Sequence, residues 1–125
     1  MKYLESFDLF EGDYEKITRG NFQDTINHMK YLELTENERL KIEKIFQRHF
    51  NPHNTVKNWP KIELWTKNGT EYYYTTMDVN EIIFIYSYED DWYFMEKYNQ
   101  ETMVSEYYKC DDLEGLKKCL EDNFK

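Results

Sequence analysis

The chain has 125 residues, 18% of them aromatic, and its 25 acidic and 16 basic residues give a formal net charge of −9. This length predicts one α+β domain, residues 1–125, with a core that needs no disulfide or metal ion. The charge argues against direct binding to nucleic acid or to an anionic membrane, and two cysteines are too few for a disulfide scaffold. Because it has no apolar leader and no apolar run of membrane length, a cytoplasmic protein is expected.

Two helices are predicted in the first half of the chain. The first is expected to begin with Asn21 as its N-cap. The second begins with the capping box Thr35-x-x-Glu38 and ends shortly before Pro52, which cannot continue a helix. Residues 1–17 allow either a short amphipathic segment or an extended stretch near their end.

Four strands are predicted between the second helix and the third. They comprise residues 61–67, 71–77, 82–88 and 92–98. Asn68-Gly69 is a strong signal for a two-residue hairpin turn between the first two strands, and such a turn pairs Trp65 with Tyr72. The third strand is apolar on both faces, which predicts a central position in the sheet and a buried Phe84.

Residues 99–105 are predicted to form a loop, and a last amphipathic helix follows, capped by Asp111 or Asp112. The predicted fold class is therefore α+β. We expect a four-stranded antiparallel meander with two N-terminal helices and one C-terminal helix packed on the sheet, in the order α-α-β-β-β-β-α.

No motif in the sequence indicates an enzyme. The sequence has no nucleophile-elbow pattern and no phosphate-binding glycine loop, so no catalytic residue and no cofactor are predicted. Histidines and cysteines could supply zinc ligands, but Pro52 interrupts the His49–His53 spacing, and no metal site is predicted. Cys119 is expected in the core, whereas Cys110, just before a helix, could form a reactive thiolate.

Negative charge is concentrated in residues 61–125, which contain 15 acids and 7 bases. A basic partner protein is expected to contact seven acidic residues, the first three of them at a hairpin tip: Glu89, Asp90, Asp91, Glu96, Asp111, Asp112 and Glu114. The alternative is a solvated acidic surface that only keeps the protein soluble.

The second predicted helix is basic, in contrast to the rest of the chain. Its basic residues are Arg39, Lys41, Lys44 and Arg48. They could neutralise the acidic body within the molecule, or they could form part of a surface for self-association or for a partner of both charges. The aromatic strands likewise fit either a core or a protein-binding face.

The opening MKYLESFDLF and the closing DDWYFMEKY and YYKCDDLEGLKKCLED resemble small uncharacterised acidic proteins of AT-rich bacteriophages. The similarity covers the two ends of the chain and carries no functional residue with it. The resemblance implies a viral accessory protein that acts in the host cytoplasm.

Together these observations predict a non-enzymatic, acidic protein-binding module. Its carboxylates would take the place of phosphates in a basic, nucleic-acid-binding host or defence protein and inhibit that protein by charge mimicry. Two alternatives fit the same composition. A virion or assembly protein would form a defined oligomer by itself, and an acidic immunity protein would neutralise a basic toxin.

Overall fold

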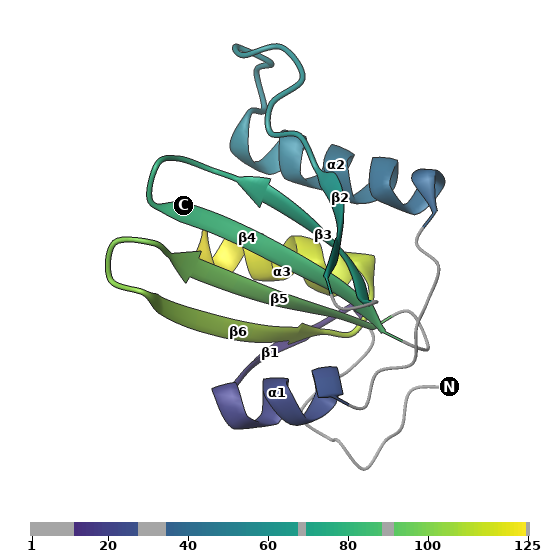
Figure 1. Cartoon of the computed structure of the whole chain (residues 1–125). Coiled ribbons are helices and arrows are strands. Elements are labelled where there is room, and N and C mark those ends of the chain that lie inside the picture. Colours follow the sequence, from purple (N-terminus) through teal and green to yellow (C-terminus); the bar gives the residue numbers. More distant parts are fainter. Residues whose placement is uncertain (1–11, 28–34, 68–69, 89–91, 125) are drawn as a thin grey trace.

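The computed structural model describes residues 12–27, 35–67, 70–88 and 92–124, and this part of the chain has an α+β fold (Figure 1). In chain order the elements are β1 (Tyr14–Ile17), α1 (Arg19–Asn27), α2 (Glu36–Phe50), β2 (Glu63–Lys67), β3 (Thr70–Thr76), β4 (Glu81–Tyr88), β5 (Trp92–Asn99), β6 (Val104–Cys110) and α3 (Leu113–Asn123). The strands form one antiparallel sheet in the order β1-β6-β5-β4-β3-β2.

The sheet has six strands, so the expectation of a four-stranded meander is wrong in detail. The four predicted strands are β2 to β5, and β6 continues the meander over two residues of the predicted loop and over residues 106–110, for which no element was predicted. The turn before β6 contains no Asn-Gly. Instead, the Asn99 side chain accepts the backbone N–H groups of Glu101 and Thr102 at 2.9 and 3.0 Å, and Met103 takes a positive φ of 60°.

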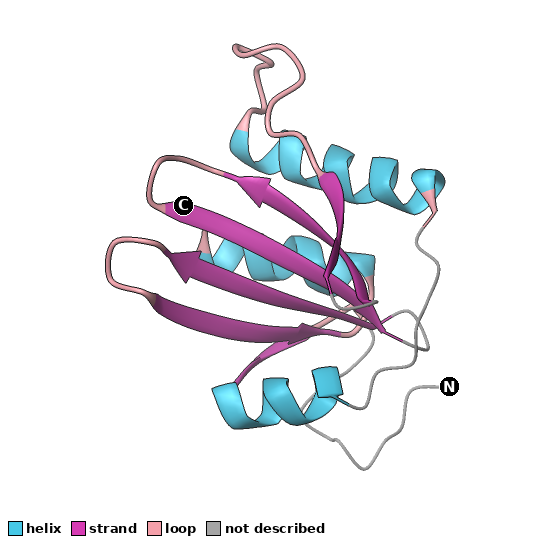
Figure 2. Cartoon of the chain, in the orientation of Figure 1, coloured by secondary structure: helices cyan, strands magenta, loops and turns pink. Residues whose placement is uncertain are grey.

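Helices cover the sheet from opposite sides (Figure 2). We call the side packed against α2 and α3 the first face; its buried side chains include Tyr73, Ile85 and Met95. Side chains alternate along a strand, so the neighbouring residues of these strands lie on the second face. There α1 inserts Phe22 against Phe94 on β5 and Tyr107 on β6, and forms a smaller core.

Capping side chains determine where the helices begin. Thr35 accepts the Glu38 N–H at 3.1 Å, which confirms the predicted cap of α2, and Asp112 caps α3 by accepting the Gly115 N–H at 2.9 Å. The cap predicted for α1 is wrong, because Thr18 accepts the N–H of Asn21 at 3.1 Å and the helix starts earlier. None of these three described helices is long and apolar enough to cross a membrane.

The register of the β2–β3 hairpin is confirmed, since Trp65 lies opposite Tyr72. β4 is central as predicted, with β3 on one side and β5 on the other. Phe84 is not its most buried residue, however. Ile83 and Ile85 are 0% exposed on the first face, whereas Phe84 is half-buried on the second.

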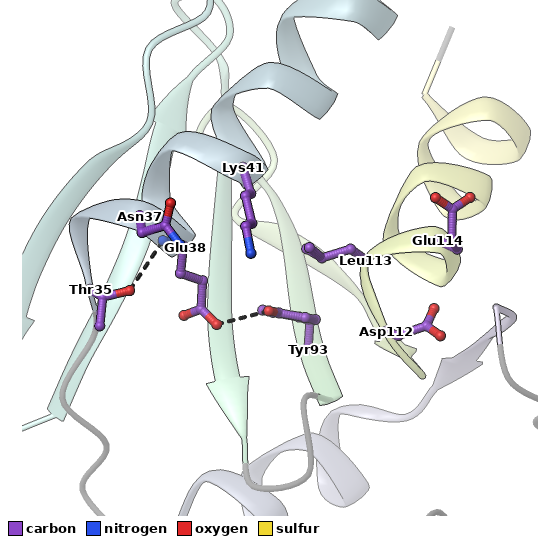
Figure 3. Close-up of a pocket in the computed structure, with 8 residues that line it drawn as sticks. All are labelled: Thr35, Asn37, Glu38, Lys41, Tyr93, Asp112, Leu113 and Glu114. Atoms are coloured by element: carbon purple, nitrogen blue, oxygen red, sulfur yellow. Dashed lines mark hydrogen bonds between the residues drawn. The ribbon is translucent and has the colours of Figure 1, made fainter.

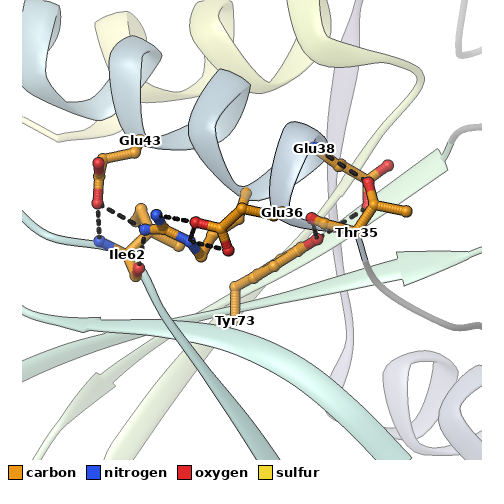
Figure 4. Close-up of polar contacts among 7 residues, drawn as sticks. Thr35, Glu36, Glu38, Glu43, Ile62 and Tyr73 are labelled. Carbon is orange, nitrogen blue, oxygen red and sulfur yellow. Dashed lines mark hydrogen bonds and ion pairs between the residues drawn. The ribbon is translucent and has the colours of Figure 1, made fainter.

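At the outer edge of the sheet, side chains of α2 bind the backbone just before β2 (Figure 4). The Ile62 N–H donates to the Glu43 carboxylate at 2.9 Å, and the Ile62 carbonyl accepts from the Arg39 guanidinium at 2.7 Å. Arg39 also forms an ion pair with Glu43 at 2.9 Å. We call these three residues the edge clamp, because they connect α2 to the start of the edge strand.

At the other edge, α3 approaches the chain just before β1 very closely. A Cβ atom built on Gly115 would lie 2.1 Å from the carbonyl oxygen of Asp13. The same carbonyl accepts the Asp111 N–H at 2.9 Å, so it is held in place. Glycine is therefore required at position 115 for space, since the residue lies within a regular helix.

Candidate functional site

A cavity of about 460 Å³ opens between the N-terminal ends of α2 and α3 (Figure 3). Its lining residues come from the beginning of both helices and from the start of strand β5. They are Thr35, Asn37, Glu38, Lys41, Tyr93, Asp112, Leu113 and Glu114. Three carboxylates and one ammonium group therefore lie around a single cavity at one end of the sheet. We call it the α2–α3 cavity.

Glu38 is held at this cavity by two tyrosines that reach it from the sheet. The hydroxyl of Tyr73 donates to Glu38 Oε1 at 3.1 Å, and that of Tyr93 donates to Oε2 at 2.9 Å (Figures 3 and 4). Both tyrosines are buried, with exposed fractions of 0% and 2%. Burial, together with the Glu38 charge, raises the pKa of Tyr73 well above its usual range, so this phenol stays a donor.

Asp112 and Glu114 face the same cavity from α3 but differ in how their carboxylates are used. Asp112 Oδ1 caps the helix, and its Oδ2 accepts the Gly12 N–H at 3.2 Å. Asp112 thus joins the start of α3 to the segment before β1. Glu114 lies in the first turn of α3 and is exposed. The positive end of the helix dipole favours a carboxylate there, so Glu114 can present its charge to solvent.

Lys41 is the basic residue among those lining the α2–α3 cavity. Further along the two helices, a second cavity of about 230 Å³ is lined by Arg48 of α2 and by Glu114, Lys117 and Glu121 of α3, among others. Both charges therefore occur on α3 at this cavity, and Arg39 of α2 forms its ion pairs with Glu36 and Glu43 of its own helix.

The predicted partner-binding residues do not form one surface. Asp112 and Glu114 lie together at the α2–α3 cavity. Glu96 lies on the second face of the sheet, where its Oε2 accepts the Ser105 hydroxyl at 2.6 Å. The hairpin tip, residues 89–91, lies outside the described residues.

Asp111 is only 1% exposed, so this structure does not support its predicted role at a partner surface. Its position explains the burial. It connects the end of β6 to the start of α3, and its N–H donates to the carbonyl of Asp13 in the interior of this junction. The sequence offered Asp111 and Asp112 equally as the cap of the last helix. It therefore did not indicate which of the two carboxylates would be buried.

The two cysteines are both buried, as was expected of Cys119. Burial raises the pKa of the Cys110 thiol well above its ordinary value, and the adjacent Cys119 raises it further. A reactive thiolate at Cys110 is therefore disfavoured. Within the described residues no group of three or more His, Cys, Asp or Glu side chains is placed to hold a metal ion.

Sequence reasoning missed Glu38, Lys41 and Tyr93 as residues of the site. Glu38 had been assigned to a capping box, a structural role that accounts for its position in the sequence. Tyr93 belongs to an aromatic strand that was interpreted as core. Only the antiparallel pairing and the placement of α2 bring the Tyr93 hydroxyl to Glu38. The arrangement suits recognition of a cationic group, because fixed carboxylates and a phenol surround an open space.

Comparison of the sequence with models of known protein families, with curated proteins and with solved structures found no match. The resemblance to bacteriophage proteins therefore stays a prediction, and the case for function depends on the geometry.

Proposed function

We propose that the chain is a non-enzymatic protein-binding module whose α2–α3 cavity takes up a basic side chain of a partner protein. The observation that carries this proposal is that Glu38, Asp112 and Glu114, from two different helices, line one open cavity. A lysine or arginine of a partner would meet two carboxylates, those of Glu38 and Asp112, that hydrogen bonds already hold in place. Little side-chain entropy would then be lost on binding.

The overall charge of −9 supports the same proposal. A strongly acidic protein attracts basic partners at long range and accelerates their association. We further propose that the partner's own ligand is a polyanion such as nucleic acid, for which the carboxylates of this chain substitute. The chain would then inhibit its partner by occupying the site of the natural ligand.

Charge reversal at two exposed glutamates tests the proposal. Glu114→Lys changes the charge at the α2–α3 cavity, and Glu101→Lys makes the same change in the β5–β6 turn at the opposite end of the sheet. Wild type and both variants are immobilised, and proteins retained from a host-cell lysate are quantified at low and high salt. We expect basic proteins to be retained by wild type and by Glu101→Lys, lost from Glu114→Lys, and released as salt rises.

Duplex DNA added in competition tests the mimicry. A partner that binds in place of nucleic acid should leave the immobilised protein as DNA is added. Equal retention by both variants would contradict the cavity as the binding site. Retention that is indifferent to DNA would contradict mimicry alone and leave the binding role of the cavity intact.

A further inference from the structure

The second face of the sheet carries a row of four side chains that the α2–α3 cavity does not involve. In the strand register Glu63 on β2 lies opposite Tyr74 on β3, Tyr74 opposite Phe84 on β4, and Phe84 opposite Glu96 on β5. Residues opposite one another in neighbouring strands share a face. On β6 the register continues to Tyr107, which is buried against Phe22 of α1, so the part of the row outside this contact has a carboxylate at each end and two aromatic rings between them. We call it the cross-strand row.

Part of this row is accessible. Glu63 is exposed, and Tyr74, Phe84 and Glu96 are half-buried. Among the described helices only α1 lies on the second face, where its Phe22 packs on Phe94 of β5, Tyr107 of β6 and Tyr86 of β4, so it reaches β4 two residues along the strand from Phe84 (Figure 1). Next to the row on β2, Trp65 is 53% exposed and meets Tyr74 edge to face at 6.4 Å. An accessible aromatic patch of this kind is typical of a protein-binding surface.

The charges at the ends of the row indicate the chemistry of the occupant. Glu96 uses Oε2 to accept from Ser105, a bond that leaves Oε1 for another donor. Glu63 lies beside the hydroxyl of Tyr74, whose pKa is raised by burial and then by the Glu63 carboxylate. Aromatic rings also attract cations through their faces. A segment with basic side chains thus matches both the ends and the middle of the row.

The spacing of the row sets the spacing of those basic side chains. Glu63 and Glu96 are three strands apart, and with about 4.8 Å between strands their backbones are roughly 14 Å apart. Four residues of an extended chain cover about 13 Å, and side chains at i, i+2 and i+4 point to the same side. Two basic residues at i and i+4 would reach the two carboxylates, with residue i+2 over the aromatic rings.

Two other occupants fit less well. A second copy docked about a twofold axis would place the same acidic row against itself, with carboxylates facing carboxylates. Residues 1–11 of this chain contain one base and three acids, so they lack the required pair of cations.

We propose that the cross-strand row binds an extended segment of a partner protein that carries two arginines or lysines four residues apart, with an apolar residue midway. This surface lies on the opposite side of the sheet from the α2–α3 cavity, and the proposal does not depend on the proposed function of that cavity.

Two peptides of identical composition test the proposal on the intact chain. Acetyl-Arg-Thr-Val-Thr-Arg-amide has the required spacing, and acetyl-Arg-Arg-Thr-Val-Thr-amide has adjacent arginines. Binding is followed at low salt through the NMR signals of the isotope-labelled protein. We expect the spaced peptide to bind about three-fold more tightly and to shift the signals of Trp65, Tyr74 and Phe84. Exposed ion pairs of 0.2–1 kcal/mol correspond to roughly this factor.

Variants locate the binding. Glu63→Gln and Glu96→Gln should each weaken binding of the spaced peptide about three-fold, whereas Glu101→Gln, in the β5–β6 turn, should leave it unchanged. Glu114→Gln removes a charge at the α2–α3 cavity and reports any binding of the peptide there. Equal affinity for both peptides, no binding by about 5 mM peptide, or loss of binding only in Glu114→Gln would overturn the proposal. So would a stable dimer that Trp65→Ser dissociates, or contacts between residues 1–11 and the row in the free protein, because either would mean that another occupant covers the face.

Discussion

Replacing Gly115 by alanine should be one of the most destabilising single-methyl changes that this chain can undergo. The added Cβ would lie 2.1 Å from the Asp13 carbonyl oxygen and 3.0 Å from its carbon. Neither atom is free to move, because that carbonyl accepts from Asp111, and the Asp13 carboxylate accepts from Tyr14 N–H at 2.8 Å. Relief of the clash requires α3 to move away from the β1 edge by about 1 Å.

The expected cost follows from what such a movement disturbs. Leu116, Cys119 and Leu120 of α3 are all 0% exposed, so their packing against the sheet would loosen. Overpacking of a core costs about 1–3 kcal/mol, and we take the upper end because the clash is with backbone. Loss of the Asp111–Asp13 hydrogen bond adds about 1 kcal/mol, and the better helix propensity of alanine returns about 1 kcal/mol. The net expectation is about 3 kcal/mol.

Urea unfolding followed by circular dichroism measures this change, and Gly20→Ala provides the matched control. A Cβ on Gly20, in α1, would have only the Thr18 hydroxyl within 4 Å, at 3.9 Å, so this variant should be neutral or stabilised by up to about 1 kcal/mol. Gly115→Ala should also melt roughly 10 °C below wild type. If both variants unfold within about 0.5 kcal/mol of wild type, the close approach of α3 to β1 is not present in solution.

Two further predictions concern the sheet. Ile85→Ala should lower the free energy of unfolding in urea by about 3 kcal/mol, because Ile85 is 0% exposed. Phe84→Ala should lower it by about half as much, because Phe84 is half-buried. Equal losses would contradict the assignment of the two faces. Burial raises the pKa of Tyr108 to about 12, so between about pH 10 and 12 the unfolded chain loses this proton while the folded chain keeps it. The free energy of unfolding should therefore be unchanged below about pH 10 and fall above it. The fall should be less steep in Tyr108→Phe. Urea unfolding at a series of alkaline pH values measures both.

Local signals in the sequence were sufficient for the elements whose boundaries are determined locally. The capping box at Thr35, the stop before Pro52 and the Asn-Gly turn each involve residues only a few positions apart, and the structure has α2 and the β2–β3 register as predicted. The apolar run of β4 predicted a central strand that is buried on both faces. The central position is confirmed, but only the first face is fully buried, since Ile83 and Ile85 are 0% exposed and Phe84 is half-buried.

The features that were not predicted involve contacts between segments far apart in the sequence, or turns that lack Asn-Gly. For β1 an extended stretch was one of the alternatives, but its pairing with β6, at the far end of the sequence, has no local signal in a strand of four residues. β6 follows a turn that depends on the Asn99 side chain. The α2–α3 cavity was missed for the same reason, since Glu38 and Tyr93 come from elements whose relative position depends on the whole sheet. The row from Glu63 to Glu96 likewise exists only in the register of four strands.

The edge clamp of Arg39, Glu43 and Ile62 has a consequence for the behaviour of the protein at high concentration. An edge strand presents unpaired backbone groups to which a strand of another molecule can add, and repeated addition leads to fibrous aggregates. At Ile62 both backbone groups are already bound by side chains of α2. A strand approaching this end of β2 would have to displace an ion pair before it could form its first hydrogen bonds. The edge clamp therefore hinders the addition of another strand to the sheet at the start of β2.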